Sequence, residues 1–184
     1  MRTWTPTILY LALFMACGTV EDPDPINQEE VITTVRVTLT PSSGPQVILQ
    51  SQDLDGVGPN PPVVSVSGNL VAGSSYAGTT EFLDESQNPA EDISSEVEEE
   101  GDEHQIFYQL GGNAQFSITY QDQDSEGNPI GLTFDLQTGT ASEGTLLVTL
   151  RHQPDKSAPG VSQGDITNAG GETDVAQSFE IIIQ

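Results

Sequence analysis

The chain has 184 residues, of which 28 are Asp or Glu and only 4 are Lys or Arg, and its formal net charge at pH 7 is −24. Such a charge excludes a nucleic-acid-binding function, which needs basic patches, and it opposes adsorption to anionic membrane surfaces. The partners that it favours are cationic: metal ions, basic peptides or basic loops of other proteins.

Residues 1–16 are predicted to be a lipoprotein signal peptide. Arg2 supplies a positive charge near the start, and residues 8–14 form an apolar run that is too short to span a membrane. The run leads to Ala16 and Cys17, and a small residue before a lone cysteine is the pattern at which a lipoprotein is cleaved and acylated. We therefore expect Cys17 to be lipidated; the alternative is an ordinary secretory signal with an incidental cysteine.

Residues 17–30 are predicted to be an acidic, flexible tether, because they are polar and contain Pro, Asp and Glu. Several acyl chains on Cys17 would anchor the tether stably in the outer membrane, in its periplasmic or its surface-exposed leaflet. An acidic run directly behind a lipidated cysteine also resembles the signal that sends Bacteroidota lipoproteins to the outer leaflet. Residues 31–184 then form one domain, which at this length buries roughly 68–70% of its unfolded surface.

The domain is predicted to be mainly β, because apolar and polar residues alternate in short segments bounded by turn residues. The predicted strands are residues 31–40, 46–52, 63–67, 75–84, 104–110, 114–122, 131–138, 144–153 and 173–184. Consecutive strands are expected to pair as hairpins, including the pair joined by residues 111–113 and the pair joined by residues 139–143. This pattern favours a single antiparallel β-sandwich or an up-and-down barrel of about nine strands.

One segment has a helical period instead and is predicted to be a short acidic helix at residues 89–100. Asn88 is suited to cap its first turn, and Pro89 to occupy the first helical position. Gly101 is suited to a left-handed conformation just past its end. Its apolar stripe consists of Ala90, Ile93 and Val97.

Acidic residues crowd the C-terminal end of this helix, namely Glu98, Glu99, Glu100, Asp102 and Glu103. Negative charges at that end oppose the helix dipole by about 0.3–1 kcal/mol each at low salt. A bound cation or a basic partner would offset this repulsion. The alternative is an acidic surface that is solvated and screened by salt.

Several short motifs resemble those of a family of small Bacteroidota lipoproteins that carry the label "type 1 periplasmic binding fold superfamily protein". The motifs are Val31-Ile32-Thr33-Thr34, Asp53-Leu54-Asp55-Gly56, Asn88-Pro89-Ala90-Glu91-Asp92-Ile93, Glu103-His104-Gln105-Ile106-Phe107-Tyr108, Gly127-Asn128-Pro129-Ile130-Gly131-Leu132-Thr133-Phe134, Val148-Thr149-Leu150-Arg151-His152 and Ala169-Gly170-Gly171-Glu172-Thr173-Asp174-Val175. The label implies a two-domain α/β fold, whereas the alternation of this chain predicts an antiparallel β domain. The resemblance implies an accessory role in uptake beside a TonB-dependent outer-membrane receptor.

His104 follows the acidic helix directly and is the strongest candidate for a metal ligand. Imidazole and carboxylate groups together suit zinc and other divalent transition metals, especially where a coordination position stays open. The predicted ligands are therefore Glu96, Glu100, Glu103 and His104. The second histidine, His152, is expected to be an ordinary surface residue at the end of a strand.

Two further acidic segments resemble calcium-binding loops, because oxygen ligands crowd a tight turn. Their candidate ligands are Asp53 and Asp55 in the first loop, and Asp122, Asp124 and Glu126 in the second. Thr133 occupies the position at which an EF-hand requires a bidentate glutamate. The alternative is that Asp and Gly occur there as ordinary turn residues.

No pattern typical of an enzyme occurs in the sequence. Lipidation would consume Cys17, no serine lies in a Gly-x-Ser-x-Gly elbow, and there is no phosphate-binding or dinucleotide-binding glycine loop. We expect a monomeric, non-enzymatic binding accessory that captures a divalent cation (zinc or calcium) or a small ligand for an outer-membrane receptor. The alternative is a structural or interaction module whose acidic helix docks on a basic protein surface.

Overall fold

The computed structural model describes residues 30–56 and 58–184. The predicted signal peptide, Cys17 and nearly all of the predicted tether lie outside the described residues, so these predictions remain predictions. Within the described ranges, no helix is long and apolar enough to cross a membrane.

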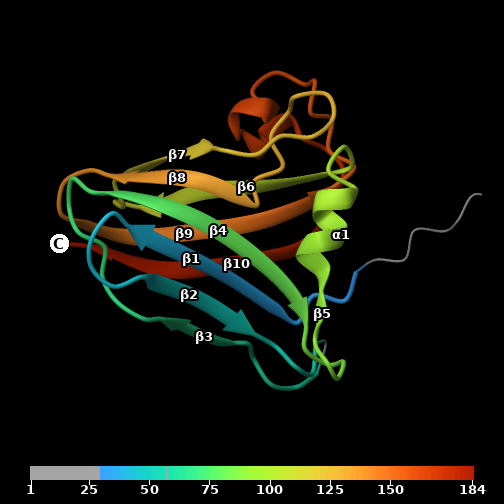
Figure 1. Cartoon of the computed structure of the whole chain (residues 1–184), viewed down its shortest axis with the longest axis horizontal. Coiled ribbons are helices and arrows are strands. Elements are labelled where there is room, and N and C mark those ends of the chain that lie inside the picture. The colour runs from blue at the N-terminus through green and yellow to red at the C-terminus, as the bar shows by residue number, and fades with distance from the viewer. Residues whose placement is uncertain (1–29, 57) are drawn as a thin grey trace, which may run out of the picture.

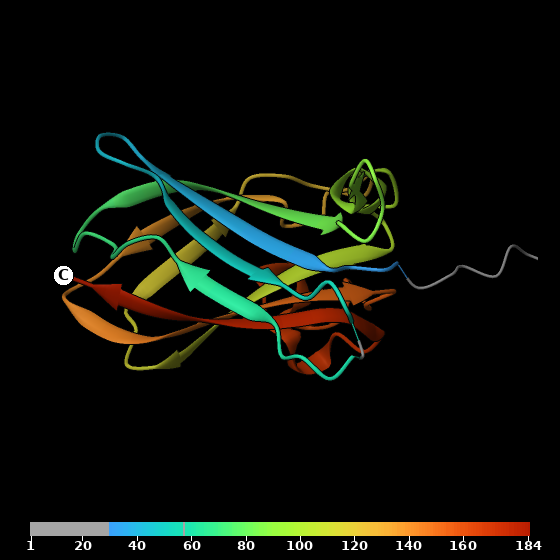
Figure 2. The same cartoon turned by 90° about the horizontal axis from the view of Figure 1, so that it is seen from below.

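The described chain folds into two antiparallel β-sheets that pack face to face (Figure 1). Its strands are β1 (Thr34–Pro41), β2 (Val47–Gln52), β3 (Val63–Val66), β4 (Ser75–Asp84), β5 (Glu91–Asp92), β6 (His104–Gly112), β7 (Phe116–Tyr120), β8 (Thr133–Thr138), β9 (Ser142–His152) and β10 (Glu172–Ile183). The larger sheet has the order β3-β2-β1-β4-β8-β7, with β5 paired to β4, and the smaller sheet has the order β10-β9-β6. Figure 2 shows the two sheets as separate layers. The predicted antiparallel sandwich is confirmed, and the alternative of a closed barrel is not what forms.

The hydrophobic core lies between the two sheets, because each long strand turns alternate side chains inward. Strand β4 is buried at every second residue, including Tyr76 and Phe82, and β10 contributes Phe179 and Ile181 from the opposite sheet. Removing apolar surface from water stabilises the fold by about 25 cal/mol per Å². The alternation seen in the sequence is therefore the main determinant of this architecture.

Two of the predicted hairpins are wrong. Strand β6 pairs with β9, and β7 pairs with β8, so the chain crosses from one sheet to the other between β6 and β7 and again between β8 and β9. An alternating strand buries its inner face in the core whichever sheet it belongs to, and β6 also buries its outward residues near its start. Local alternation therefore predicts that a strand is half buried but leaves its pairing partner open.

Helix α1 (Ile93–Glu99) is shorter than the predicted helix at residues 89–100. Glu91 and Asp92 form β5, and pairing with β4 holds them in an extended conformation that a helix cannot include. The capping residue is therefore Asp92 and not Asn88, and its side chain accepts a hydrogen bond from the backbone N–H of Ser94 at 3.1 Å.

The prediction for Gly101 is also wrong, because this residue does not take a left-handed conformation. The helix ends instead at a C-cap residue, Glu100, with φ −98° and ψ 31°. A Cβ atom at position 101 would lie 2.6 Å from Cδ1 of Ile130, so a larger residue there would require the end of the Ile130 side chain to move.

The beginning of β6 is covered on both faces. On the inner face, α1 lies across one end of the sandwich and buries Ile93 and Val97 in the core (Figure 1). On the outer face, Phe107 packs against Val161 and Ala169. These two residues belong to the loop after β9, which contains two short 3-10 helices, η1 (Val161–Gln163) and η2 (Ile166–Asn168). A side chain at the start of β6 is thereby shielded from water.

Candidate metal site

His104 is the first residue of β6, and its side chain is completely buried. It is paired in register with His152 of β9, and the two rings stack with their centroids 4.9 Å apart and their planes 15° from parallel. His152 was expected to be an ordinary surface residue, but this contact places it beside the candidate ligand. The interstrand register, which the sequence does not reveal, brings the two histidines together.

The two ring nitrogens of His104 have different surroundings. Nδ1 lies 3.2 Å from the carbonyl oxygen of Glu100, and a carbonyl oxygen can only accept, so Nδ1 carries the hydrogen of this bond. Nε2 has no hydrogen-bond partner among the described residues, although it lies 3.4 Å from Oε1 of Glu30. A histidine that binds a metal has this arrangement, with one ring N–H held by an acceptor and the other nitrogen directed at the ion.

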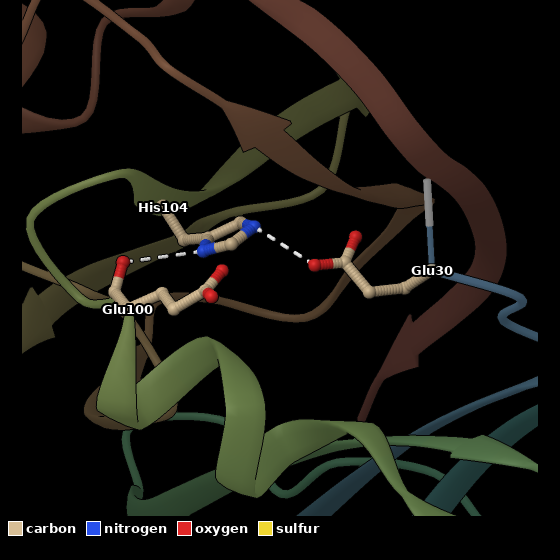
Figure 3. Close-up of side chains that lie close together, drawn as sticks. All are labelled: Glu30, Glu100 and His104. Atoms are coloured by element: carbon tan, nitrogen blue, oxygen red, sulfur yellow. Dashed lines mark hydrogen bonds and ion pairs between the residues drawn. The ribbon is translucent and has the colours of Figure 1, made fainter. Parts of the chain in front are cut away.

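Glu30, Glu100 and His104 each direct one ligand atom into the same small volume, and these atoms all lie within 4.8 Å of one another (Figure 3). They come from the chain before β1, from the end of α1 and from the start of β6. Two ligands of a tetrahedral zinc ion are about 3.4 Å apart, given bonds of 2.0–2.2 Å. The separation of 3.4 Å between Nε2 of His104 and Oε1 of Glu30 has this value.

The structure brings together Glu100 and His104, two of the four predicted ligands. Glu96 lies one helical turn before Glu100, outside the cluster. The pKa of Glu96 is raised, first by burial and then by the nearby carboxylates of Glu91, Glu30 and Glu100. The helix and the chain before β1 thus place like charges close together, and a cation bound between them would reduce their repulsion.

The fourth predicted ligand, Glu103, faces the neighbouring histidine instead. Its Oε2 atom accepts a hydrogen bond from Nε2 of Gln153 at 3.0 Å and lies 3.5 Å from Nε2 of His152. The hydrogen bond from Gln153 lowers the pKa of Glu103, and proximity to His152 lowers it further. Glu103 therefore acts on the second histidine of the stack.

Glu30 is the residue of the cluster that sequence reasoning missed. It was placed in the tether, but in the structure its side chain is only 7% exposed and lies against His104. No local pattern marks it, because its contact is made with residues about seventy positions later in the chain. An acidic residue immediately before the first strand is the only signal available.

The second predicted calcium loop is held by backbone hydrogen bonds. Asp122 accepts the amides of Gly131 and Thr133, both at 2.7 Å. Asp124 accepts the amides of Glu126 and Asn128 through Oδ1 and leaves Oδ2 available. The aspartates thus perform the turn-forming role that was the alternative to calcium binding.

The remaining oxygen of Asp124 binds the ammonium group of Lys156. Nζ of Lys156 lies 2.8 Å from this oxygen, and it also donates to the carbonyl oxygens of Gly101 at 2.5 Å and Pro129 at 3.2 Å. Both side chains are nearly completely buried, with 5% of Lys156 and 1% of Asp124 exposed. Lys156 therefore supplies a positive charge just past the C-terminal end of α1, where the crowded carboxylates oppose the helix dipole.

The first predicted calcium loop is also a turn stabilised by a side chain. Oδ2 of Asp55 accepts a hydrogen bond from Nδ2 of Asn60 at 2.6 Å, and this bond lowers the pKa of Asp55. Asp53 joins the loop to the sheet through its backbone N–H, which donates to the carbonyl oxygen of Thr33 at 2.7 Å. These contacts leave the two carboxylates outside the cluster around His104.

An open pocket of about 450 Å³ lies beside the end of α1 and is also acidic. Its lining includes five carboxylates, those of Glu98, Glu99, Asp102, Asp122 and Asp124. We call it the acidic groove. Asp102 is held in place on its wall, because its carboxylate accepts hydrogen bonds from the amide and the hydroxyl of Ser125.

Comparison of the chain with known protein families, with curated proteins and with solved structures found no match. Any functional conclusion therefore depends on the geometry and the chemistry of the site.

Proposed function

We propose that the protein is a non-enzymatic lipoprotein of the cell envelope that binds a divalent transition metal of the zinc class through Glu30, Glu100 and His104. The observation that carries this proposal is the position of His104, whose Nε2 is buried without a hydrogen bond, lies 3.4 Å from Oε1 of Glu30, and belongs to a cluster that also includes Glu100. Lipidation of Cys17 would hold the site at the outer membrane. The bound ion would then be available to a TonB-dependent receptor.

The chemistry of the three ligands favours a zinc-class ion over calcium or magnesium. Calcium takes six to eight oxygen ligands and magnesium an octahedron of them, whereas imidazole nitrogen suits zinc and its neighbours. Three protein ligands also leave one position of a tetrahedral ion open. An open position suits a protein that captures an ion and later passes it on.

An ion pair between a protonated His104 and Glu30 is the competing explanation of the same contact. In that case Nε2 would carry a hydrogen, and the cluster would need no metal. The two explanations differ in their response to zinc, since only a site with a lone pair on Nε2 gains a bond to the ion.

Glu100→Gln is expected to weaken zinc binding by at least about tenfold, equivalent to 1.4 kcal/mol, because it removes one of the three ligands. Glu99→Gln removes the same charge from the adjacent helical position and is expected to change the affinity less than twofold. Isothermal titration calorimetry of the full chain with zinc measures both. Equal losses in the two variants, or equal binding of magnesium, would mean that zinc is held only by the overall negative charge.

Metabolic labelling with a palmitate analogue is expected to mark the wild-type protein and not Cys17→Ala. The reason is that Cys17 is the only cysteine of the chain and directly follows the apolar run. Fractionation of the same cells should recover the wild type with the outer membrane. Equal labelling of both proteins would exclude the anchor.

A second candidate function, docking on a basic protein surface, is favoured by the acidic groove. Five carboxylates around one pocket form a field that attracts cationic side chains. This function would depend on Glu98 and Glu99, and it would leave Glu30 and His104 without a role.

A further inference from the structure

We infer that metal binding at this site controls the position of the chain that leads into β1, with Glu30 as the ligand that closes the site over the ion. This inference rests on the proposed function and adds its regulation. It makes the N-terminal end of the domain the means by which the ion is retained or released.

The first observation is that Glu30 differs from the other two ligands in how it is held. His104 lies within β6, and Glu100 continues directly from α1. Glu30 precedes the first strand, and the hydrogen bonds that attach this part of the chain to the sheet begin at Thr33. The backbone N–H of Thr33 donates to the carbonyl oxygen of Leu83 at 3.0 Å, and the carbonyl oxygen of Thr33 accepts from the backbone N–H of Asp53 at 2.7 Å.

Among the described residues, no backbone hydrogen bond holds residues 30–32. Ile32 packs only in part against the core, and Val31 is 59% exposed. The polar contact of the Glu30 side chain is with Nε2 of His104 at 3.4 Å, although packing leaves that side chain only 7% exposed (Figure 3). A ligand on such a segment moves more readily than a ligand within a helix or a strand.

The second observation is electrostatic. Without an ion, the carboxylate of Glu30 lies near those of Glu100 and Glu96, and like charges at this spacing repel. With a divalent cation between Glu30 and Glu100, the same arrangement becomes attractive. The ion therefore favours the position in which Glu30 covers His104 over positions in which the segment has moved away.

Coupling of this kind is reciprocal. If zinc stabilises the closed position of Glu30, then a partner that draws the N-terminal segment away from α1 must lower the zinc affinity by the same factor. A receptor that engages this segment would thus release the ion through the position of the chain alone. The site needs no change in the sandwich itself for the transfer.

The test is hydrogen–deuterium exchange of the full chain, measured with zinc, with magnesium and without a divalent cation. Zinc is expected to slow exchange of the Val31 and Ile32 amides by about tenfold in the wild type, within the usual range of coupling between sites. Glu30→Gln is expected to abolish this slowing and to weaken zinc binding by about tenfold. Glu143→Gln is the charge-matched control, because Glu143 is exposed near the opposite end of β9 from His152, and it should behave as the wild type.

The outcomes separate the two proposals. Failure of the wild type to bind zinc would contradict both. Zinc binding that is weakened by Glu100→Gln but unchanged by Glu30→Gln, or that leaves exchange at Val31 and Ile32 unchanged, would overturn only the closing role of Glu30. Glu30→Asp, which keeps the carboxylate on a shorter side chain, is expected to restore part of the slowing.

Discussion

Replacing Lys156 by methionine is expected to lower the free energy of unfolding by about 3–5 kcal/mol, the usual effect of breaking a buried ion pair. The ammonium group of Lys156 joins the carboxylate of Asp124 to the carbonyl oxygens of Gly101 and Pro129. Methionine is unbranched and nearly as long, but it leaves these three acceptors without their donor. The buried carboxylate of Asp124 would then have no neutralising charge.

Urea denaturation measures this change directly, and the melting temperature should fall by about 10 °C for a chain of this size. Arg36→Met is the matched control, because Arg36 also pairs with an acid, Glu81, at 3.2 Å, but both side chains are partly exposed. Its expected effect is below about 1 kcal/mol, as for other surface ion pairs. Similar small losses in both variants would contradict the structural role of Lys156.

The effect of Lys156→Met should also depend on pH. Burial by itself would raise the pKa of Asp124, but the hydrogen bond from Lys156, the backbone amides and the charge of Lys156 outweigh burial, and the pKa is lowered. A carboxylate with a lowered pKa contributes stability above its unfolded value, about 3.9, and loses it as the pH falls through the folded value. The difference between wild type and variant is therefore expected to be complete at pH 7 and to shrink below about pH 4.

Replacing His104 by phenylalanine is expected to lower the zinc affinity at least about hundredfold, equivalent to 2.7 kcal/mol, because it removes the only nitrogen ligand of the cluster. Phenylalanine retains a ring that can stack on His152, so the packing of the buried position is largely kept. At a hundredfold excess of zinc over its Kd, the wild type should gain about 2.7 kcal/mol of stability. His104→Phe should gain at most about 0.4 kcal/mol, because its Kd would equal or exceed the same zinc concentration. Thermal melting with and without zinc measures both.

His152→Phe is the control for this experiment. His152 stacks on the same ring, but its Nε2 faces Glu103 and lies outside the three-residue cluster. Its zinc affinity is expected to fall less than that of His104→Phe, since His152 contributes no atom to the three-residue cluster. An equal loss in the two variants would contradict the assignment of His104 as the ligand.

The strands were predictable because burial of one face leaves a period of two in the sequence. The strand predicted at residues 75–84 coincides with β4 at both ends. The start of the helix was not predictable, because Asn88 and Pro89 satisfy the local rules for a helix start equally well. Pairing of Glu91 and Asp92 with β4, a contact between segments, overrides those rules.

The candidate site shows the same division between local and distant contacts. Glu100 and His104 are four residues apart, and their proximity follows from the chain itself. Glu30 and Lys156 reach the end of the helix from distant parts of the chain, and no periodicity in the sequence records either contact. The sequence thus indicated that a cation would offset the repulsion at the end of α1, whereas the fold determines which residues lie there.

The most direct test of the proposed site is an anomalous difference map from crystals of the full chain grown with zinc, recorded above the zinc absorption edge. The proposal predicts one peak bonded to Nε2 of His104 and to carboxylate oxygens of Glu30 and Glu100, at about 2.0–2.2 Å from each. A map without a peak beside His104, or with its zinc only in the acidic groove beside Glu98 and Glu99, would contradict it.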